Sequence, residues 1–470
     1  MDPLAGAPAA VERELRRVLG AGPAQLTAAT AEIYRSRGVT LPIWSDGRQE
    51  ARTVVLDPLP RVLTADVWAR LAAGAGQRHR ALDAFLADAY RAAGRRRGDP
   101  DRSAEIVRAG VLPEWAVAHS PGRDPGAIGL AWPGQPRAAV AAADLVETAT
   151  GEWTVVGDRL QVPAGLGYAL AAREGVTAIG AGHFPPDGVL DAGDALPMLL
   201  DGLATAAPAA CAGAPRIAVL TTPDGSGVPF EDALVARALD VPLVHPGELW
   251  PRMDGGLEAV LDGDRTPVDV LYRRFGDTAL GAYATPAGQP LDVLLSDAVR
   301  AGRLGLANVP GNGIADDAAT FAWVPEMIRF YLGEEPLLSS LRTRVLADPE
   351  QWTAVRDRMQ EFVFTPVAGY GGGRGVAGPS CSAEELDRLR REISAAPHRF
   401  VAQEPVAVAP LPTAAGNGWE PQPASLRVFT VGGATVRALP APLTCAGPGD
   451  GGFPTLETGA ATKDTWLLGS

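Results

Sequence analysis

Cysteine, histidine and lysine are all scarce in this sequence of 470 residues. The three cysteines, Cys211, Cys381 and Cys445, lie far apart, so neither a disulfide framework nor a cysteine zinc site is predicted, and a reducing cytoplasm fits. The five histidines occur singly and indicate no zinc site and no Ser-His-Asp triad. No hydrophobic run approaches the length of a membrane span, and the N-terminal residues lack the apolar core of a signal peptide. We therefore expect a cytoplasmic protein that does not enter a membrane.

Basic residues are also fewer than acidic ones, with 42 lysines and arginines against 55 aspartates and glutamates. The formal net charge is −13, and the one dense basic run, Arg95-Arg96-Arg97, has the ordinary interpretation of a solvated helix end. Because nucleic acids are bound through clustered lysine and arginine, this balance argues against a nucleic-acid partner. What is present is a globular composition, with 46% hydrophobic and 21% charged residues, and enough length for two or three domains.

The segment from residue 215 to about 310 alternates apolar strands with helices at short intervals. The predicted strands are PRIAVLTT, VPLVHP, VDVLYRRF and RLGLANVPG, and the predicted helices are VPFEDALVARALD and PLDVLLSDAVRAG. This alternation is typical of a parallel, doubly wound sheet, whose ligands bind at the carboxyl ends of the strands. Those ends read TTPDGSG, YRRFGD and NVPGNGIADD. The first of them is no G-x-G-x-x-G motif, which disfavours a dehydrogenase.

The rest of the chain combines helices with hairpins. Helices are predicted over residues 8–36, 64–93, 316–361 and 382–396. Hairpins are predicted across Gly157-Asp158 and Gly432-Gly433. The Pro/Gly-rich segments 410–424 and 440–460 are predicted to be loops, mobile or lid-like.

Residues 362–379, FVFTPVAGYGGGRGVAGP, pass from an apolar strand into a glycine-dense loop. Glycines at this density let backbone N–H groups come close to an anion, most often a phosphate. A lysine usually accompanies such a loop, but the strand carries Thr365 where we look for it. A bulged hairpin packed against a neighbouring element explains these residues equally well when they are taken alone.

The order of the motifs is more specific than any one of them. The C-terminal half carries, in sequence, YRRFGD, ANVPGNGIADD, YLGEEPLL, the glycine-rich loop, FVAQEPV, LRVFTV and KDTW. In this order they resemble the circularly permuted ATP-grasp proteins of type 2, relatives of ligases of the glutathionylspermidine-synthetase type. The upstream stretches DPLPRVLTADVW, QRHRALDAFLADAY and LQVPAGLGYALAAR resemble the same family, so the likeness covers almost the whole chain.

The resemblance implies an α/β (α+β) fold, in which a Rossmann-like parallel sheet precedes a circularly permuted ATP-grasp domain. The predicted regions are 1–210 (helical and α+β), 211–315 (Rossmann-like) and 316–470 (ATP-grasp, with the glycine-rich loop). The implied activity is that of an ATP-dependent carboxylate–amine ligase, with ATP and Mg²⁺ as cofactors and an acyl phosphate as intermediate. Phosphoryl transfer of this kind depends on positioning and on neutralisation of charge.

The resemblance assigns roles to two strand ends. Arg273 and Arg274 would clamp a phosphate or a carboxylate, although a structural salt bridge is an alternative for one of them. The family usually has several aspartates after this pair, of which only Asp277 is present, and we assign it to the metal. Asn308 would give Mg²⁺ an oxygen ligand, or would form an Asx turn before Pro310.

Further roles fall on the C-terminal region. The loop glycines that would cover the phosphates are Gly369, Gly371, Gly372, Gly373 and Gly375. Gln403 and Glu404 match the hinge that meets adenine or ribose, with an exposed strand edge as the alternative. Arg427 matches an arginine of the phosphate or acyl-phosphate site. Lys463, in KDTW, would serve phosphate or would simply solvate the C-terminus.

Three cations of the family pattern are missing. The residues that stand in their places are Ala318, Thr365 and Cys445. Asp316 and Asp317, just before the first of these, are expected to cap a helix rather than to bind metal. Arg374 and Lys463 are candidate substitutes for the missing charge. Because each charge-assisted hydrogen bond contributes about 1.5–3 kcal/mol, two or three losses would weaken ATP binding by roughly several orders of magnitude.

Two hypotheses follow. The first is a working carboxylate–amine ligase with a rearranged phosphate site, acting on a small-molecule or peptide carboxylate and an amine. The second is a degenerate ATP-grasp protein that acts as a binding or scaffold partner. Relatives in the family are often found with a helical protein called α-E, which makes a protein partner of that kind plausible under the second hypothesis.

Overall fold

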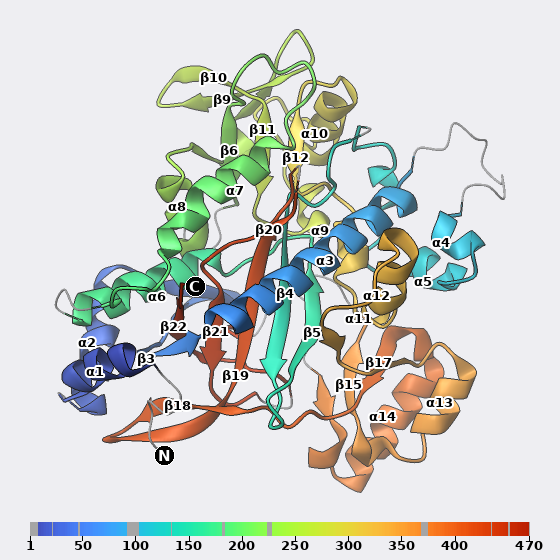
Figure 1. The fold of residues 1–470 in the computed structure, drawn as a ribbon. Helices are drawn as coiled ribbons and strands as arrows, with labels where there is room; N and C mark the ends of the chain where they lie inside the picture. Colours follow the sequence, from blue (N-terminus) through green and yellow to red (C-terminus); the bar gives the residue numbers. More distant parts are fainter. Residues whose placement is uncertain are drawn as a thin grey trace.

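The computed structural model of the chain describes residues 8–20, 22–45, 48–91, 103–132, 134–180, 184–222, 228–367, 375–433, 435–449 and 452–469. Figure 1 shows a central sheet with a smaller α/β unit at each side. Within the described residues, no helix is both long and apolar enough to cross a membrane. All three cysteines are free.

The central sheet joins strands from both ends of the chain. Among the described residues its strands run in the order β13-β5-β4-β19-β21-β22-β3, with β18 and β20 paired to β19. Their bounds are β3 Leu56–Leu63, β4 Val140–Glu147, β5 Trp153–Arg159, β13 Ser339–Ser340, β18 Pro410–Ala415, β19 Gly418–Val431, β20 Arg437–Ala438, β21 Leu443–Ala446 and β22 Ala461–Leu467. Strands from the predicted regions 1–210 and 316–470 therefore share one sheet, and the region boundaries themselves stay a prediction.

Helices cover both faces of this sheet, because alternate side chains of each strand point to opposite faces. The long helix α3 (Ala65–Ala89) lies across one face, where Leu71 and Ala75 pack on Leu145 and Val428. Thr64 caps its first turn. The other face carries α2 (Pro23–Ser36), α6 (Leu166–Ile179) and α7 (Ala195–Ala204), and α1 (Ala9–Leu19) joins the same core.

The predicted parallel sheet is confirmed. Strands β6 (Ile217–Leu220), β7 (Leu243–Val244), β11 (Val270–Arg273) and β12 (Gly305–Ala307) pair in parallel in the order β12-β11-β6-β7. Helices α8 (Phe230–Ala238) and α10 (Leu291–Arg300) lie between them in the sequence, as predicted. The strands β8 (Leu249–Pro251), β9 (Leu257–Leu261) and β10 (Asp264–Val268) form a small antiparallel sheet beside this unit.

A second small unit lies at the other side of the central sheet (Figure 1). Its antiparallel sheet has the order β14-β17-β15-β16, with bounds Thr343–Val345, Phe400–Gln403, Val363–Pro366 and Val376–Ala377. Helices α13 (Pro349–Val355) and α14 (Ala383–Ala395) accompany it. A reciprocal capping box between Ser382 and Glu385 explains why α14 begins where it does. This unit carries the strand on each side of the glycine-rich loop.

The remaining elements are short. They are β1 Thr40–Ser45, β2 Arg48–Thr53, α4 Glu105–Arg108, α5 Glu114–Ala118, α9 Asp277–Leu280, α11 Ala318–Phe321, α12 Val324–Met327 and a π-helical turn over Ile328–Leu332. Of the two predicted hairpins, the one across Gly432-Gly433 is confirmed, since β19 pairs with β20.

Three predictions of local structure were wrong, and a fourth was wrong in part. Gly157 and Asp158 are not a turn: β5 runs straight through them, Gly157 opposite Asp144, and Asp158 pairs with Arg78 of α3. Residues 410–424 are no loop but a hairpin, in which prolines are tolerated because β18 is an edge strand. The stretch 334–345 is not helical: it contains the short strand β13, which pairs with β5, and Leu338 and Leu341 are buried in the same core as α3 and β5. The segment 440–460 contains β21, and only its later part is a loop.

Candidate nucleotide-binding cavity

A cavity of about 450 Å³ lies between the central sheet and the small sheet of β14–β17. The central sheet contributes Asp144, Arg159, Arg427 and Cys445, and the small sheet contributes Thr365, Gly375 and Gln403, with Glu404 directly after it. The loop after β21 closes a further side with Phe453, Leu456 and Glu457. The volume lies within the range of about 300–1,000 Å³ that is typical of small-molecule sites.

One carboxylate organises the wall formed by the central sheet. Asp144 of β4 accepts hydrogen bonds from Arg427 Nε at 2.6 Å and Nη2 at 2.9 Å, and from Arg159 Nε at 3.1 Å. Arg427 also donates through Nη1 to the carbonyl of Ala164 at 2.7 Å. The three strands β4, β5 and β19 are neighbours in the sheet, so the pleat itself brings the three side chains together.

The electrostatics of this wall follow from its burial. Burial by itself raises the pKa of Asp144, but the guanidinium groups of Arg427 and Arg159 outweigh it and hold that pKa below its usual value. Burial lowers the pKa of Arg427, and Asp144 more than restores it, so this pKa lies above its ordinary value. Asp144 and Arg427 are therefore charged, and because arginine is protonated in proteins, the three groups together carry a net positive charge into the cavity.

The opposite wall is polar, and among the described residues that line it there is no cation. Thr365 donates to Gln403 Oε1 at 3.2 Å, and Gln403 Nε2 donates to Thr343 at 3.1 Å. These bonds fix the end of β17, just before Glu404, which is paired with Arg344 at 3.4 Å and with Arg342 at 3.5 Å. The hinge predicted at Gln403 and Glu404 thus faces the cavity, with a neutral threonine beside it.

Cys445 completes the wall on β21. Its side chain is buried, and burial raises the pKa of its thiol to about 12. The thiol is therefore neutral at physiological pH. It offers the cavity no charge at a position where the family pattern described above has a cation.

Arg274 does not line this cavity. Its guanidinium is buried and pairs with two carboxylates of α8, Glu231 at 2.8 Å and Asp232 at 2.9 Å. Nη1 also donates to the hydroxyl of Tyr272 at 2.9 Å. These contacts match the salt-bridge alternative considered for one of the two arginines, and the catalytic role of Arg274 stays a prediction.

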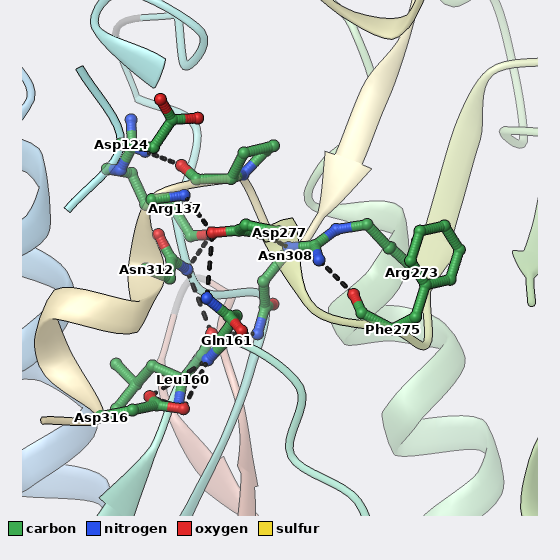
Figure 2. A network of polar contacts seen from close by, with 12 residues as sticks. Asp124, Arg137, Leu160, Gln161, Arg273, Phe275, Asp277, Asn308, Asn312 and Asp316 are labelled. Atoms are coloured by element: carbon green, nitrogen blue, oxygen red, sulfur yellow. Dashed lines mark hydrogen bonds and ion pairs between the residues drawn. The ribbon is translucent and has the colours of Figure 1, made fainter. Parts of the chain in front are cut away.

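Arg273 and Asp277 belong to a separate buried network, which Figure 2 shows. The ion pair between them is 2.6 Å long. Asp277 also accepts from Gln161 Nε2 at 3.0 Å and from the N–H of Gly311 at 2.7 Å. Arg273 donates in addition to the carbonyl of Phe275. In the carboxylate predicted to bind metal, Oδ2 thus accepts two hydrogen bonds and Oδ1 lies in the ion pair with Arg273.

The side chain of Asn308 also makes its hydrogen bonds within the protein. Its Oδ1 accepts from the N–H of Val140 at 3.0 Å, and its Nδ2 donates to the carbonyls of Val140 at 2.7 Å and Leu160 at 2.6 Å. The side chain is buried and bridges two segments of the central sheet. These bonds are not the Asx turn considered as its alternative, and the metal role of Asn308 stays a prediction.

Lys463 is the single lysine of the sequence, and it is buried. Its ammonium group donates to Asp57 at 2.5 Å and to the carbonyls of Leu59 at 3.1 Å and Pro412 at 2.9 Å. Asp57 in turn accepts from the N–H of Ala414 at 2.7 Å. Lys463 therefore does not solvate the C-terminus; it holds β3 and the β18 hairpin together, away from the cavity.

Both aspartates before Ala318 were predicted to cap a helix, which is confirmed for Asp317 and wrong for Asp316. Asp317 caps α11 by accepting from the N–H of Thr320 at 2.6 Å, and it also pairs with the hydroxyl of Ser120. Asp316 accepts from the N–H groups of Leu160 at 2.5 Å and Gln161 at 3.2 Å. Burial raises the pKa of Asp316 to about 7 and that of Asp317 to about 6.

Most of the predicted phosphate loop lies outside the described residues. This applies to Gly369, Gly371, Gly372, Gly373 and Arg374. Gly375 is described and lines the cavity, where an added Cβ would come within 3.4 Å of Thr365 Oγ1. The strands that flank the loop thus lead to the cavity from one side.

The comparison with known families decides the relationship. The family model described as circularly permuted ATP-grasp type 2 matches residues 60–446. The chain belongs to this family. The predicted resemblance and fold class are thereby confirmed.

Relatives of this ATP-grasp chain include longer proteins. It is 39% identical over 92% of its length to a protein of Frankia alni named "Putative glutamate--cysteine ligase 2-3", and covers 48% of that protein. It is 37% identical over 97% of its length to the correspondingly named 2-2 protein of Frankia casuarinae, and covers 52% of it. The chain thus spans about half the length of these relatives. An uncharacterized protein of Mycobacterium leprae is 33% identical over 94% of this chain and 76% of that protein.

A solved structure has the same overall fold. It is a glutathione synthetase-like effector from Globodera pallida in its apo form, with a TM-score of 0.56 and 11% identity, and the match covers 95% of this chain and 97% of that one. At this identity the likeness concerns the fold alone.

The ATP-grasp family implies ATP and Mg²⁺ as cofactors. The residues of this chain fit ATP better than they fit Mg²⁺. The cavity has the size and the walls for a nucleotide: a polar strand end at Gln403 and a cationic pair at Arg159 and Arg427. For Mg²⁺, the described residues contain no group of three His, Cys, Asp or Glu side chains that could hold a metal ion. Asp277 and Asn308, the predicted ligands, are occupied by protein donors. The residues of the described chain therefore fit ATP but do not fit a protein-held Mg²⁺.

Three charged residues of the cavity were not singled out in the sequence: Asp144, Arg159 and Glu457. Asp144 lies on β4, for which no element was predicted, Arg159 lies on β5 in the stretch predicted as a hairpin, and Glu457 lies in the predicted loop 440–460. A signal was present, since Asp144 interrupts an otherwise apolar strand, VAAADLVE. A charge in such a strand needs a partner, and the partner could be found only once the register with β5 and β19 was known.

Proposed function

We propose that this chain binds ATP in the cavity and acts as a carboxylate–amine ligase. The observation that carries the proposal is the cavity itself, bounded by Gln403 and Glu404 on the small sheet and by Arg427 on the central sheet. These are the positions for which the family resemblance in the sequence implies the nucleotide hinge and the phosphate-site arginine. Arg427 and Glu404 thus lie in one cavity although they come from different sheets.

The proposed reaction has two steps. A carboxylate oxygen of the substrate attacks the γ-phosphorus of ATP, the bond to the β,γ-bridging oxygen breaks, and ADP leaves. The nitrogen of an amine then attacks the acyl carbon, the bond to the phosphate oxygen breaks, and the amine releases a proton. Gln403 and Glu404 orient the nucleotide, and Arg427 with Arg159 neutralises charge that is spread over the transferred group.

The substrates are proposed only by class. The names of the Frankia proteins describe chains about twice as long as this one, and half of each lies outside the match. A carboxylate and an amine are the chemistry that those names share with the ATP-grasp fold.

Phosphate release tests the proposal. The full chain is incubated with ATP and Mg²⁺ in solution, with and without a mixture of amino acids and short peptides. We expect release of phosphate that needs both ATP and the mixture, and an Arg427→Gln variant should release it about 10²-fold more slowly. Arg437→Gln is the matched control, because Arg437 is exposed, pairs with Asp201 and does not line the cavity. Absence of phosphate release together with absence of ATP binding at millimolar concentration would contradict the proposal.

A second candidate function is a scaffold that has lost the ligase reaction. It is favoured by one observation: Arg273, Arg274 and Lys463, which were expected to meet phosphate, are all neutralised by carboxylates of the protein. A helical protein of the α-E type is then the proposed partner.

The variant Thr365→Lys separates the two candidates, since residue 365 lines the cavity. Calorimetric titration with ATP is made on the wild type and on the variant. Micromolar binding by the wild type favours the ligase. ATP binding by the variant alone indicates an ATP-grasp fold that no longer binds its nucleotide, which favours the scaffold.

A further inference from the structure

Within the part of the chain that the structure describes, the cavity has no free set of metal ligands. Divalent cations such as Mg²⁺ are held by carboxylate, carbonyl and water oxygens. Of the carboxylates that line the cavity, Asp144 accepts hydrogen bonds from two arginines, and Glu404 lies between Arg342 and Arg344. Among the described lining residues only Glu457 remains, and one carboxylate is a poor metal site.

Arg159 has N–H donors that make no hydrogen bond within the described chain. Its side chain is 36% exposed and lines the cavity, whereas that of Asp144 is 12% exposed. A guanidinium carries five N–H groups, and within the described chain only the Nε of Arg159 has a partner. Both terminal nitrogens are therefore available to a ligand. Gly157 lies beside them, and an added Cβ there would be in ordinary contact with Nη2 at 3.5 Å.

Asp144 holds the two guanidinium groups at fixed positions. Arg427 donates to both of its oxygens and Arg159 donates to one, so neither arginine has to be ordered when an anion enters. The trio carries one net positive charge at a partly buried wall. Arginine is suited to this role because its planar fork matches the oxygens of phosphate and carboxylate groups.

We propose that Arg159 and Arg427, joined by Asp144, bind the anionic end of the ligand without a protein-held metal ion. The inference rests on the proposed function, and it identifies Arg159 as a further binding residue. The ligand group is a polyphosphate or a carboxylate, whose oxygens present the same chemistry to the two guanidinium groups. Mg²⁺ that binds the ligand in solution then competes with these arginines and does not assist them.

Titration with inorganic tripolyphosphate, and separately with ATP and with glutamate, tests this proposal. Each is titrated into the full chain by calorimetry, once with EDTA and once with millimolar Mg²⁺. We expect binding in EDTA that is at least as tight as in Mg²⁺. Arg159→Gln should weaken binding by about tenfold to a hundredfold, the effect of one charge-assisted group. The three probes show whether the anion is a phosphate or a carboxylate.

The control is Arg437→Gln, since Arg437 is also a partly exposed arginine with one carboxylate partner but lies outside the cavity. Thermal midpoints of all variants show that folding is retained. Binding that needs Mg²⁺, or that Arg159→Gln leaves unchanged, would overturn this inference and leave ATP binding intact. Absence of binding by every probe would overturn both this inference and the proposed function.

Discussion

Asp316 shows what burial does to one residue. Its carboxylate accepts two backbone N–H groups, from Leu160 and Gln161, and the charge of Arg159 acts on it as well. Burial nevertheless outweighs these contacts and raises its pKa from 3.8 to about 7. In the unfolded chain the same group ionises near its ordinary value.

This difference predicts a pH dependence of stability. Between about pH 4 and pH 7 the folded chain keeps the Asp316 proton and the unfolded chain has lost it, so stability falls as the pH rises through this window. The effect amounts to about 4 kcal/mol by pH 8. In Asp316→Asn the amide cannot ionise, so the thermal midpoint of this variant should rise relative to the wild type between pH 5 and pH 8. An equal difference at both pH values would contradict the prediction, and Asp191→Asn, at an exposed carboxylate that also accepts a backbone N–H, is the control.

Single residues also show the limit of sequence reasoning. Arg427 could be placed in the cavity because it lies within a motif of fixed order, and Gln403 and Glu404 for the same reason. The structural partners of Arg274 could not be predicted, because Glu231 and Asp232 follow a different strand and are brought near only by packing. The sequence shows that a charge is present, but its neighbours decide whether it faces a ligand or another charge.

At the scale of elements, the ion pair between Lys463 and Asp57 contacts the hairpin of β18 and β19. The hairpin was predicted to be a loop because its prolines suggested one. The N–H of Ala414 donates to Asp57, and the carbonyl of Pro412 accepts from Lys463, so both charged side chains bind the edge strand. Contacts between residues so far apart in the sequence leave no local pattern from which they could be predicted.

The variant Lys463→Met tests this role. It leaves the Asp57 carboxylate buried without its cation, which we expect to destabilise the chain by about 3–5 kcal/mol. Hydrogen exchange at Ala414 should become faster. Combining Lys463→Met with Asp57→Asn removes the unpaired charge, and the double variant should be more stable than the single one.

The same variant tests the catalytic role predicted for Lys463. Because its ammonium group lies away from the cavity, ATP binding by the remaining folded protein should be unchanged in Lys463→Met. Loss of binding with an unchanged thermal midpoint would show that the lysine serves the nucleotide instead.

At the scale of the whole molecule, the alternation of strands and helices predicted the parallel unit correctly. Which strands form the central sheet could not be predicted from the sequence. Alternation is a local signal, and each βαβ step repeats it. The central sheet instead pairs β3 with β22 and β4 with β19, across most of the chain. Only the family resemblance implied that the two ends form one fold, and it did so without giving the register that creates the cavity.

The network of Figure 2 joins the parallel unit to the central sheet, and it yields the last prediction. Asp277 holds Arg273 at the end of β11, Gln161 just after β5, and the N–H of Gly311. In Asp277→Asn the buried Arg273 loses its counter-charge, so the thermal midpoint should fall, with a loss of about 3–5 kcal/mol. Affinity for ATP in EDTA and in Mg²⁺ should change by the same factor, because the carboxylate serves the protein and not a metal ion. A variant that keeps its thermal midpoint but loses affinity only in Mg²⁺ would instead support the metal role that the sequence suggested for Asp277.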